Sequence, residues 1–449
     1  MKKGISVFLA LLIVCMLFSG CSPARDGNRN AGDTANAEGG LTIYALDAEL
    51  WWKTAAENFE KHNDDVAVRV ELFQTAEELE MRLNTELPAG GGPDLILYCP
   101  FTSNIDMQRM AYSGRFLALD DYFAADETFN ADNYYAPVWE YGVFDGSRYV
   151  VSCGFTMPGI ITTEERLAQG DYAQLSGYEY TMKDLFACIV EEAERLSGST
   201  SDFAYSVLTD NLSYSSCLNY SGLLGIDYAA KTLHLDQENV RELTDAYREL
   251  YNELVRANEI SQKAASVQDI IASGTFFAYT FDPANLMLSA ATVMERDLNF
   301  TAKALMLPRY EQADEYIAQS VLEMAVNKNS NHPELAYRFI RSVMDGPALK
   351  VAEQGANSNY FYSINRSVCE RYIEQVPDLM GAQAPGKTAY THVEPALTHA
   401  LENMSGCRSI SGNVNQIIVE SIMPYINGED SFDTCYANMV AKLQLYLTE

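Results

Sequence analysis

Histidines and carboxylates are the residues with which this chain could carry out acid–base or metal chemistry. Only His392 and His399, among the five histidines, stand two helical turns apart. Acidic doublets such as Asp120-Asp121 are adjacent in sequence, so their side chains diverge and do not readily share a proton. The residue pattern predicts no catalytic residue, no cofactor, no metal site and no phosphate-binding loop. A glycosidase pair assembled from two distant carboxylates stays open.

Cys21 follows a segment that is typical of an export signal. Lys2 and Lys3 precede an almost wholly apolar run over residues 5–17, and small residues lead into the cysteine. A charged start, a short apolar core and small residues before the cleavage point predict a secretory signal over residues 1–20.

The residues around Cys21 also resemble the cleavage box of bacterial lipoproteins, in which the thiol is acylated and becomes the new N-terminus. This resemblance implies an anchor of acyl chains such as palmitate at the extracellular face of the cell membrane, at about 0.8 kcal/mol per buried methylene. Residues 21–40 are poor in large apolar side chains, so we expect a flexible tether there. No other stretch is long and apolar enough to span a bilayer.

The chain is strongly acidic. Its formal net charge is -31, and loss of Lys2 and Lys3 with the signal leaves 29 basic against 62 acidic residues, or -33. This balance argues against nucleic acid as a partner and against a body that lies flat on anionic lipid. A solvated acidic surface explains it, and it also permits a cationic ligand such as a polyamine or a metal ion.

Removing Cys15 and Cys21 from the nine cysteines leaves seven. Their number is odd, their spacings are wide and none forms a C-x-x-C pair, which argues against a disulfide framework and against a zinc site. We expect several of them to pack as small core residues, and the sequence leaves one or two disulfides open.

The folded part begins with alternating strand-like and helix-like patterns. Residues 41–45, 66–73 and 94–98 predict strands, and the segments between them predict helices. This order predicts an α/β fold in which helices cover both faces of a parallel sheet. Four further helices are expected after Thr181, after Asp236, from Pro333 and over residues 432–447.

The order of the elements resembles extracellular solute-binding proteins of ABC importers, in the sugar-binding class that includes maltose-binding protein. The similar segments are spread along the chain at residues 41–59, 92–96, 116–123, 271–279, 318–326, 331–355 and 418–449. The resemblance implies a two-lobe periplasmic-binding-protein-like fold that closes on its ligand through hinge crossovers. It places lobe one at 41–152 plus 303–364, lobe two at 153–302 plus 365–449, and the crossings near 150–155, 305–309 and 362–365.

Ligands of open α/β sheets sit beyond the carboxyl ends of strands, and sugars require aromatic faces with hydrogen-bonding groups around them. Trp52 shares a helical stripe with Ala55 and Phe59 and is expected in the core, whereas Trp51 points to the cleft or the surface. The predicted ligand-binding residues are Asp47, Glu49, Trp51, Tyr98, Phe101, Phe155, Tyr279, Phe281, Asp282 and Tyr360.

One departure from the family concerns the segment after the first crossing. Many sugar receptors have Tyr-Asn there, whereas this chain has Ile161-Thr162-Thr163. The missing aromatic side chain argues against a maltodextrin-like binding mode, and it leaves the predicted fold unaffected.

The function implied by the resemblance is capture of a small solute, most simply a carbohydrate, and its delivery to the subunits of an ABC permease. The chain would touch the membrane only through its lipid anchor and would not bind nucleic acid. Two alternatives remain open, a sensor that presents its ligand to a membrane receptor and a secreted carbohydrate-active enzyme.

Overall fold

The computed structural model describes residues 40–46, 51–100, 105–170, 172–197, 213–261, 278–280, 291–292, 294–296, 299–345, 361–379 and 384–448. These residues form a mixed α/β structure, which confirms the predicted fold class.

Three parallel strands open the fold. Strand β1 (Gly40–Leu46) pairs in parallel with β2 (Ala67–Phe73) and with β3 (Leu95–Tyr98). Helices α1 (Trp51–Lys61) and α2 (Ala76–Glu86) alternate with these strands along the chain. The predicted order of strand, helix, strand, helix and strand is confirmed.

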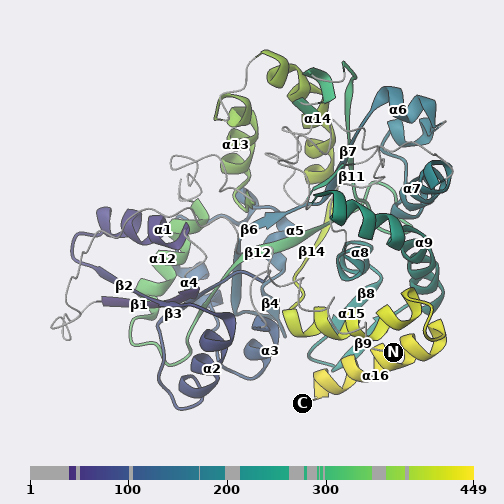
Figure 1. The fold of residues 1–449 in the computed structure, drawn as a ribbon. Coiled ribbons are helices and arrows are strands. Elements are labelled where there is room, and N and C mark those ends of the chain that lie inside the picture. Colours follow the sequence, from purple (N-terminus) through teal and green to yellow (C-terminus); the bar gives the residue numbers. More distant parts are fainter. Residues whose placement is uncertain are drawn as a thin grey trace, which may run out of the picture. The chain divides into compact units, whose positions relative to one another are not determined.

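Helices cover both faces of these strands (Figure 1). Neighbouring residues of a strand point to opposite faces, so each strand contributes to two cores. Ile43 and Leu95 join the largest core cluster, which includes side chains of α1 and α12 (Pro333–Asp345). Tyr44 and Ile96 join another core cluster, which includes side chains of α2. This double burial explains why β3 is apolar throughout, whereas β2, at the edge of the sheet, is more exposed and contains Arg69 and Glu71.

Strands from later in the chain extend the same sheet, whose order is β13-β6-β12-β3-β1-β2 with β14 also paired to β12. These later strands are β6 (Val150–Thr156), β12 (Tyr316–Val326), β13 (Tyr362–Ser363) and β14 (Met404–Arg408). All 11 residues of β12 are buried. One end of β12 pairs in parallel with β14 and the other end pairs antiparallel with β3, so this strand connects regions that are distant in sequence.

A smaller antiparallel sheet has β7 (Gly159–Thr163) between β10 (Ala278–Thr280) and β11 (Ala302–Met306). Only residues 157–158 separate β6 from β7, so the chain passes directly from the large sheet to the small one. Two hairpins complete the strands, β4 (Val143–Phe144) with β5 (Ser147–Arg148), and β8 (Leu224–Asp227) with β9 (Thr232–Leu235).

The four helices predicted from their caps and apolar stripes are all present, as α7 (Met182–Ser197), α9 (Gln237–Ser261), α12 and α16 (Phe432–Thr448). Asp236 caps α9, because its Oδ1 accepts hydrogen bonds from the backbone N–H groups of Glu238 and Asn239 at 3.0 Å. The other α-helices among the described residues are α3 (Met107–Tyr112), α4 (Asp120–Ala125), α5 (Ala136–Glu140), α6 (Glu164–Gln169), α8 (Tyr214–Tyr220), α13 (Arg366–Leu379), α14 (Ala384–Glu402) and α15 (Gly412–Ile426).

A further core cluster lies among helices of the C-terminal region. Leu185 of α7, Leu218 of α8, Leu243 of α9 and Ile418 of α15 are all fully buried in it. Trp52 belongs to the largest cluster and is 7% exposed, which confirms its predicted place in the core.

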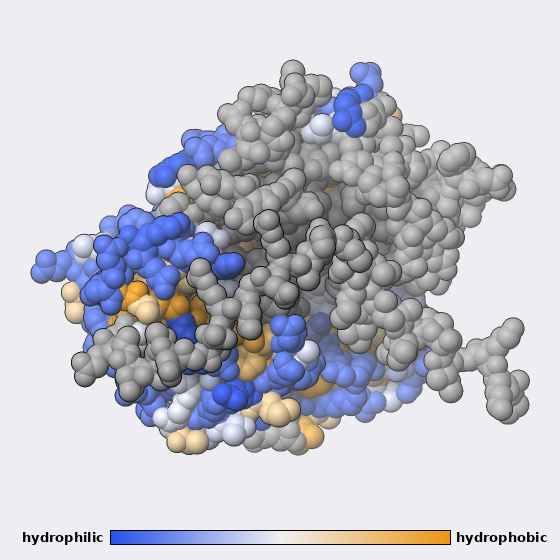
Figure 2. All heavy atoms as spheres, turned by 60° about the vertical axis from the view of Figure 1, so that its left-hand side comes forward, coloured by the Kyte–Doolittle hydropathy of each residue, from blue (hydrophilic) through white to orange (hydrophobic). Residues whose placement is uncertain are grey.

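Hydrophilic residues cover most of the described surface on the face that Figure 2 shows, with hydrophobic patches between them. Inside the fold, Cys153, Cys217 and Cys369 are buried free thiols that pack as small core residues. Within the described ranges, no cluster of histidine, cysteine and acidic side chains could hold a metal ion. In the same part of the chain, no helix combines the length and the apolar character that a membrane span requires.

Candidate ligand-binding site

Asp106 lies where the N-terminal strands and helices meet the C-terminal elements. It caps α3, and its Oδ1 accepts a hydrogen bond from the backbone N–H of Arg109 at 2.9 Å. Its Oδ2 accepts hydrogen bonds from the hydroxyls of Tyr228 at 2.6 Å and Tyr446 at 3.0 Å. Because Tyr228 follows β8 and Tyr446 lies in α16, this one carboxylate joins three segments that are far apart in sequence.

Asp106 is buried, and its carboxylate interacts with protein hydrogen-bond donors. The residue is 9% exposed, and burial raises the pKa of its carboxyl, while the hydroxyl of Tyr228 and the N–H of Arg109 act in the opposite direction. Burial also raises the pKa of Tyr446 to about 12, so its hydroxyl stays protonated and donates at neutral pH. The Arg109 guanidinium lies 4.8 Å from the centroid of the Tyr446 ring, within the range of a cation–π contact.

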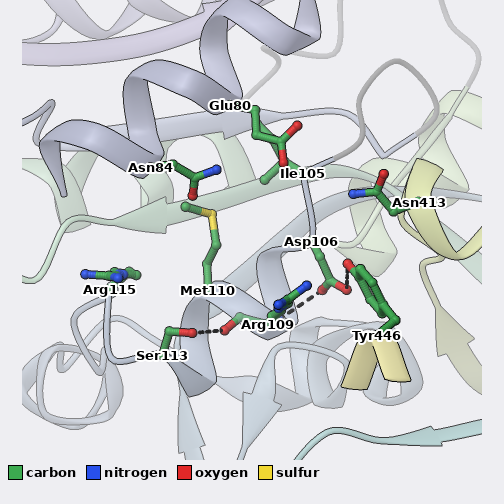
Figure 3. Close-up of a pocket in the computed structure, with 10 residues that line it drawn as sticks. All are labelled: Glu80, Asn84, Ile105, Asp106, Arg109, Met110, Ser113, Arg115, Asn413 and Tyr446. Carbon is green, nitrogen blue, oxygen red and sulfur yellow. Dashed lines mark hydrogen bonds between the residues drawn. The ribbon is translucent and has the colours of Figure 1, made fainter. Parts of the chain in front are cut away.

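A cavity of about 300 Å³, here called the Asp106 cavity, opens beside this carboxylate. Figure 3 shows Asp106 and Tyr446 facing each other, with Glu80 and Asn84 contributed by α2. Its walls are formed by Glu80, Asn84, Ile105, Asp106, Arg109, Met110, Ser113, Arg115, Asn413 and Tyr446. Both acidic and basic side chains line this cavity, so it is suited to a polar ligand.

A second cavity of about 440 Å³, here called the tyrosine cavity, has walls from α3, β4, β8 and the end of β14. It is lined by Gln108, Tyr112, Tyr141, Val143, Phe144, Asn219, Leu224, Gly225, Ile226, Asp227, Tyr228, His234, Cys407, Arg408, Ser409 and Ile410. Helix α3 contributes to both cavities, so the two lie on either side of one short helix.

Aromatic rings and hydrogen-bonding groups alternate on the walls of the tyrosine cavity. The rings of Tyr112 and Tyr228 are stacked, with centroids 6.2 Å apart and planes inclined by 12°. Gln108, Asn219 and Ser409 add side chains that both donate and accept hydrogen bonds. Flat apolar faces beside such groups can bind a ring that carries hydroxyl groups, such as a sugar.

A buried acid stands behind this cavity. Glu323 of β12 is 1% exposed, and its Oε1 accepts a hydrogen bond from the Tyr141 hydroxyl at 2.8 Å. Its Oε2 accepts no hydrogen bond from the described residues. Burial raises the pKa of Glu323 to about 7, with hydrogen-bonding groups such as Tyr141 opposing that rise. Glu323 therefore changes charge near neutral pH and holds the hydroxyl of a wall residue.

Two of the predicted ligand-binding residues have described side chains, and both are buried. Tyr98 is 1% exposed, and its hydroxyl donates to the carbonyl oxygen of Ile105 at 2.5 Å. Phe155 is fully buried, with its ring 5.4 Å from that of Tyr135 and 5.8 Å from that of Tyr362. Neither residue lines the two cavities, so a ligand contact at these positions stays a prediction.

The backbone alone is described for two other candidates. Trp51 is the first residue of α1, and Tyr279 lies in β10 opposite Ile160 of β7. Lipid attachment at Cys21 and the remaining candidates, Asp47, Glu49, Phe101, Phe281, Asp282 and Tyr360, lie outside the described residues.

Four residues of these cavity walls were not among the predicted site residues, namely Asp106, Tyr228, Tyr446 and Arg408. Asp106 carried one local signal, since an acid that directly precedes a helical segment is a common N-cap. Nothing local could show that its partners lie 122 and 340 residues further along the chain.

Residues 381–388 read G-A-Q-A-P-G-K-T and have the spacing of a phosphate-binding loop, which the residue pattern was expected to lack. That loop requires a strand before it and a helix after it. Here helix α13 precedes the motif, ending at Leu379, and α14 begins inside it at Ala384. The match therefore lacks the structural context that binds phosphate.

No family model matches the chain, and no curated protein matches it in sequence. Solved structures with the same fold are found. The sugar-binding protein MalE from Xanthomonas citri has a TM-score of 0.61 and 14% identity over 91% of this chain and 97% of its own. An extracellular solute-binding protein family 1 member from Alicyclobacillus acidocaldarius has a TM-score of 0.59 and 13% identity over 91% and 98%.

An ABC substrate-binding protein from Listeria monocytogenes, solved in complex with cycloalternan, has a TM-score of 0.58 and 14% identity over 91% of this chain and 99% of its own. At such low identities the similarity establishes the fold. At the level of the fold, it confirms the expected resemblance to extracellular solute-binding proteins of ABC transporters and the predicted two-lobe architecture.

Proposed function

We propose that this protein captures a carbohydrate outside the cell and delivers it intact to an ABC permease. The observation that supports this most is the fold, which is shared with sugar-binding proteins over about nine tenths of the chain. The tyrosine cavity adds stacked aromatic rings and hydrogen-bonding side chains, which suit a sugar ring.

The proposal includes two lobes, over residues 41–152 plus 303–364 and over 153–302 plus 365–449. Ligand would bind between them and favour closure by as much as it prefers the closed state. The direct passage from β6 of the large sheet to β7 of the small one supports a crossing near residues 150–155. The mechanism requires no chemical change in the solute, so the protein would not be an enzyme.

We also propose that Cys21 is acylated and that the protein stays at the extracellular face of the membrane. The apolar run before Cys21 and the small residues that lead into it support this step. Replacement Cys21→Ser should release the protein from the membrane fraction while leaving ligand binding unchanged. Retention of the C21S protein in that fraction would contradict the lipid anchor.

Ligand binding to the purified protein is the test of the proposed function. A ligand at 100 times its Kd stabilises the folded state by about 2.7 kcal/mol, which raises the melting temperature by several degrees. We expect this rise with at least one saccharide in a panel of mono- and oligosaccharides, amino acids and polyamines. Recovery of the bound saccharide unaltered separates capture from turnover. A rise with amines alone, or chemical conversion of the sugar, would refute the proposal.

Phe281→Ala tests one of the predicted ligand contacts in the same assay. We expect it to reduce the saccharide-dependent rise, because it removes an aromatic face. Tyr98→Ala is less informative, because Tyr98 is 1% exposed and its loss would destabilise the free protein as well.

A further inference from the structure

Arg408 is a half-buried cation on the wall of the tyrosine cavity. It is the last residue of β14, where it stands opposite Gln319 of the parallel strand β12. Its Nη1 donates a hydrogen bond to the carbonyl oxygen of Leu224 in β8. This contact fixes one side of the guanidinium fork. The other two guanidinium nitrogens, Nε and Nη2, make no hydrogen bond to a described residue. Neither of them is a buried atom left without a partner.

Two buried arginines, Arg148 and Arg166, show what is unusual about Arg408. Arg148 is 5% exposed and Arg166 is 7% exposed, and burial lowers the pKa of each to about 10. Acidic side chains oppose that effect in both cases, with Glu140 the largest contributor for Arg148 and Glu192 for Arg166. Burial lowers the pKa of Arg408 to about 10 as well, but the charge acting on it is another cation, Arg309.

No described carboxylate lies within ion-pair distance of Arg408. Asp227 lines the same cavity, but its Oδ1 accepts a hydrogen bond from the backbone N–H of Ala230 at 2.8 Å, within its own turn. Acidic residues outnumber basic ones by 62 to 31 in this chain, so a cavity arginine without an acidic neighbour is unexpected. The complementary anion is therefore absent from the described protein and can come from a ligand.

The rest of the wall defines what else that ligand would contain. The rings of Tyr112 and Tyr228 offer aromatic faces, and Gln108 and Asn219 offer amide donors and acceptors. A guanidinium fork matches the two oxygens of a carboxylate. We propose that the tyrosine cavity takes an acidic saccharide of the uronic-acid kind, whose carboxylate pairs with Arg408, an inference that rests on the proposed function.

The acidic character of the whole protein does not oppose this pairing strongly. Charges in solution at physiological salt are screened beyond about 8 Å, so the nearest groups dominate. Arg408 is the only arginine or lysine among the described residues that line the tyrosine cavity.

Calorimetric titration of the purified full-length protein tests the proposal. The ligands are oligosaccharides of galacturonate and glucuronate, the matching galactose and glucose oligosaccharides, and citrate as a carboxylate without a sugar ring. We expect one of the acidic saccharides to bind more tightly than its neutral match, and Arg408→Gln to weaken that binding by about 10- to 100-fold. Arg408→Lys keeps the charge without the fork, so an intermediate loss is expected.

Arg241→Gln is the matched control, because Arg241 is a partly exposed arginine that pairs with Asp433 and does not line this cavity. It should leave the affinity unchanged. If neutral saccharides bind and acidic ones do not, the inference is refuted and the proposed function stands. If citrate binds as tightly as the acidic saccharide, the saccharide part is refuted. If no saccharide binds, the proposed function fails too. A loss in R408Q equal to that in R241Q would also overturn the role of Arg408.

Discussion

Asp106 and Arg408 are two charged side chains on the walls of neighbouring cavities, and their surroundings differ in kind. The Asp106 carboxylate accepts three hydrogen bonds, from the Arg109 backbone and from the Tyr228 and Tyr446 hydroxyls. Within the described residues, Arg408 makes one hydrogen bond, to the backbone carbonyl of Leu224. A buried charge whose partners are all in the protein stabilises one arrangement of the chain, whereas a charge that lacks them is available to a ligand.

This difference in hydrogen bonding indicates a structural role for Asp106 and a ligand-binding role for Arg408. Asp106 joins α3 to the segment after β8 and to α16, so it holds the N-terminal and C-terminal elements together. Arg408 lines the tyrosine cavity, and its pairing depends on what enters there. The comparison can be tested by stability measurements on variants, from the largest expected effect to the smallest.

Asp106→Ala should have the largest effect. It leaves two tyrosine hydroxyls and one backbone N–H without their acceptor, each costing about 1–3 kcal/mol if no water replaces it. We expect urea unfolding to show a loss of about 2–4 kcal/mol. Asp433→Ala is the control, because that carboxylate is 71% exposed and its loss should cost less than about 1 kcal/mol. Equal losses in the two variants would show that Asp106 does not join the two regions.

Glu323→Gln extends the comparison to a third buried charged residue. Only one oxygen of the Glu323 carboxylate accepts a hydrogen bond from the described residues. The pKa of Glu323 is raised to about 7 from 4.5, so the folded state binds this proton more tightly than the unfolded state. Protonated Glu323 therefore contributes most to stability at low pH. This contribution falls by on the order of 3 kcal/mol as the pH rises from about 4.5 to about 7.

The Glu323→Gln protein cannot lose this proton. Its stability relative to wild type should increase between pH 5 and pH 8, which denaturant unfolding at both values measures. Because other titrating groups are common to both proteins, the difference isolates Glu323. A difference that does not change with pH would show that Glu323 is ionised throughout this range.

Tyr112→Ala tests the aromatic contact that accompanies the Asp106 hydrogen bonds. Tyr112 is 38% exposed and stacks on Tyr228, so we expect a loss of about 1 kcal/mol in urea unfolding. Tyr112→Phe keeps the ring and should match wild type. A loss as large as that of D106A would mean that stacking, and not the carboxylate, dominates this contact.

Arg408→Met should have the smallest effect on the free protein, less than about 1 kcal/mol, because it removes a charge that has no acidic partner among the described residues. Arg166→Met should cost more, because the fully buried carboxylate of Glu192 lies near that arginine. Both are measured by unfolding without ligand. A larger loss for R408M than for R166M would assign Arg408 a structural role.

Local patterns were sufficient to predict the three opening strands and several of the helices of this fold. The strands β1, β2 and β3 and the helices α7, α9, α12 and α16 follow from apolar spacing and capping residues, and all are present. The order of these elements also led to the fold, which the solved structures confirm. These features are predictable because a strand or helix is specified by residues a few positions apart.

The binding region was not predictable in the same way. Tyr98 and Phe155 follow the rule for ligand positions at strand ends, yet their side chains are buried among neighbours from other segments. The sequence alone determined which segments form helices and strands, and how acidic the chain is. Only the tertiary structure decided that Asp106 meets Tyr228 and Tyr446 and that Arg408 faces a cavity, because such contacts depend on how segments more than a hundred residues apart pack together.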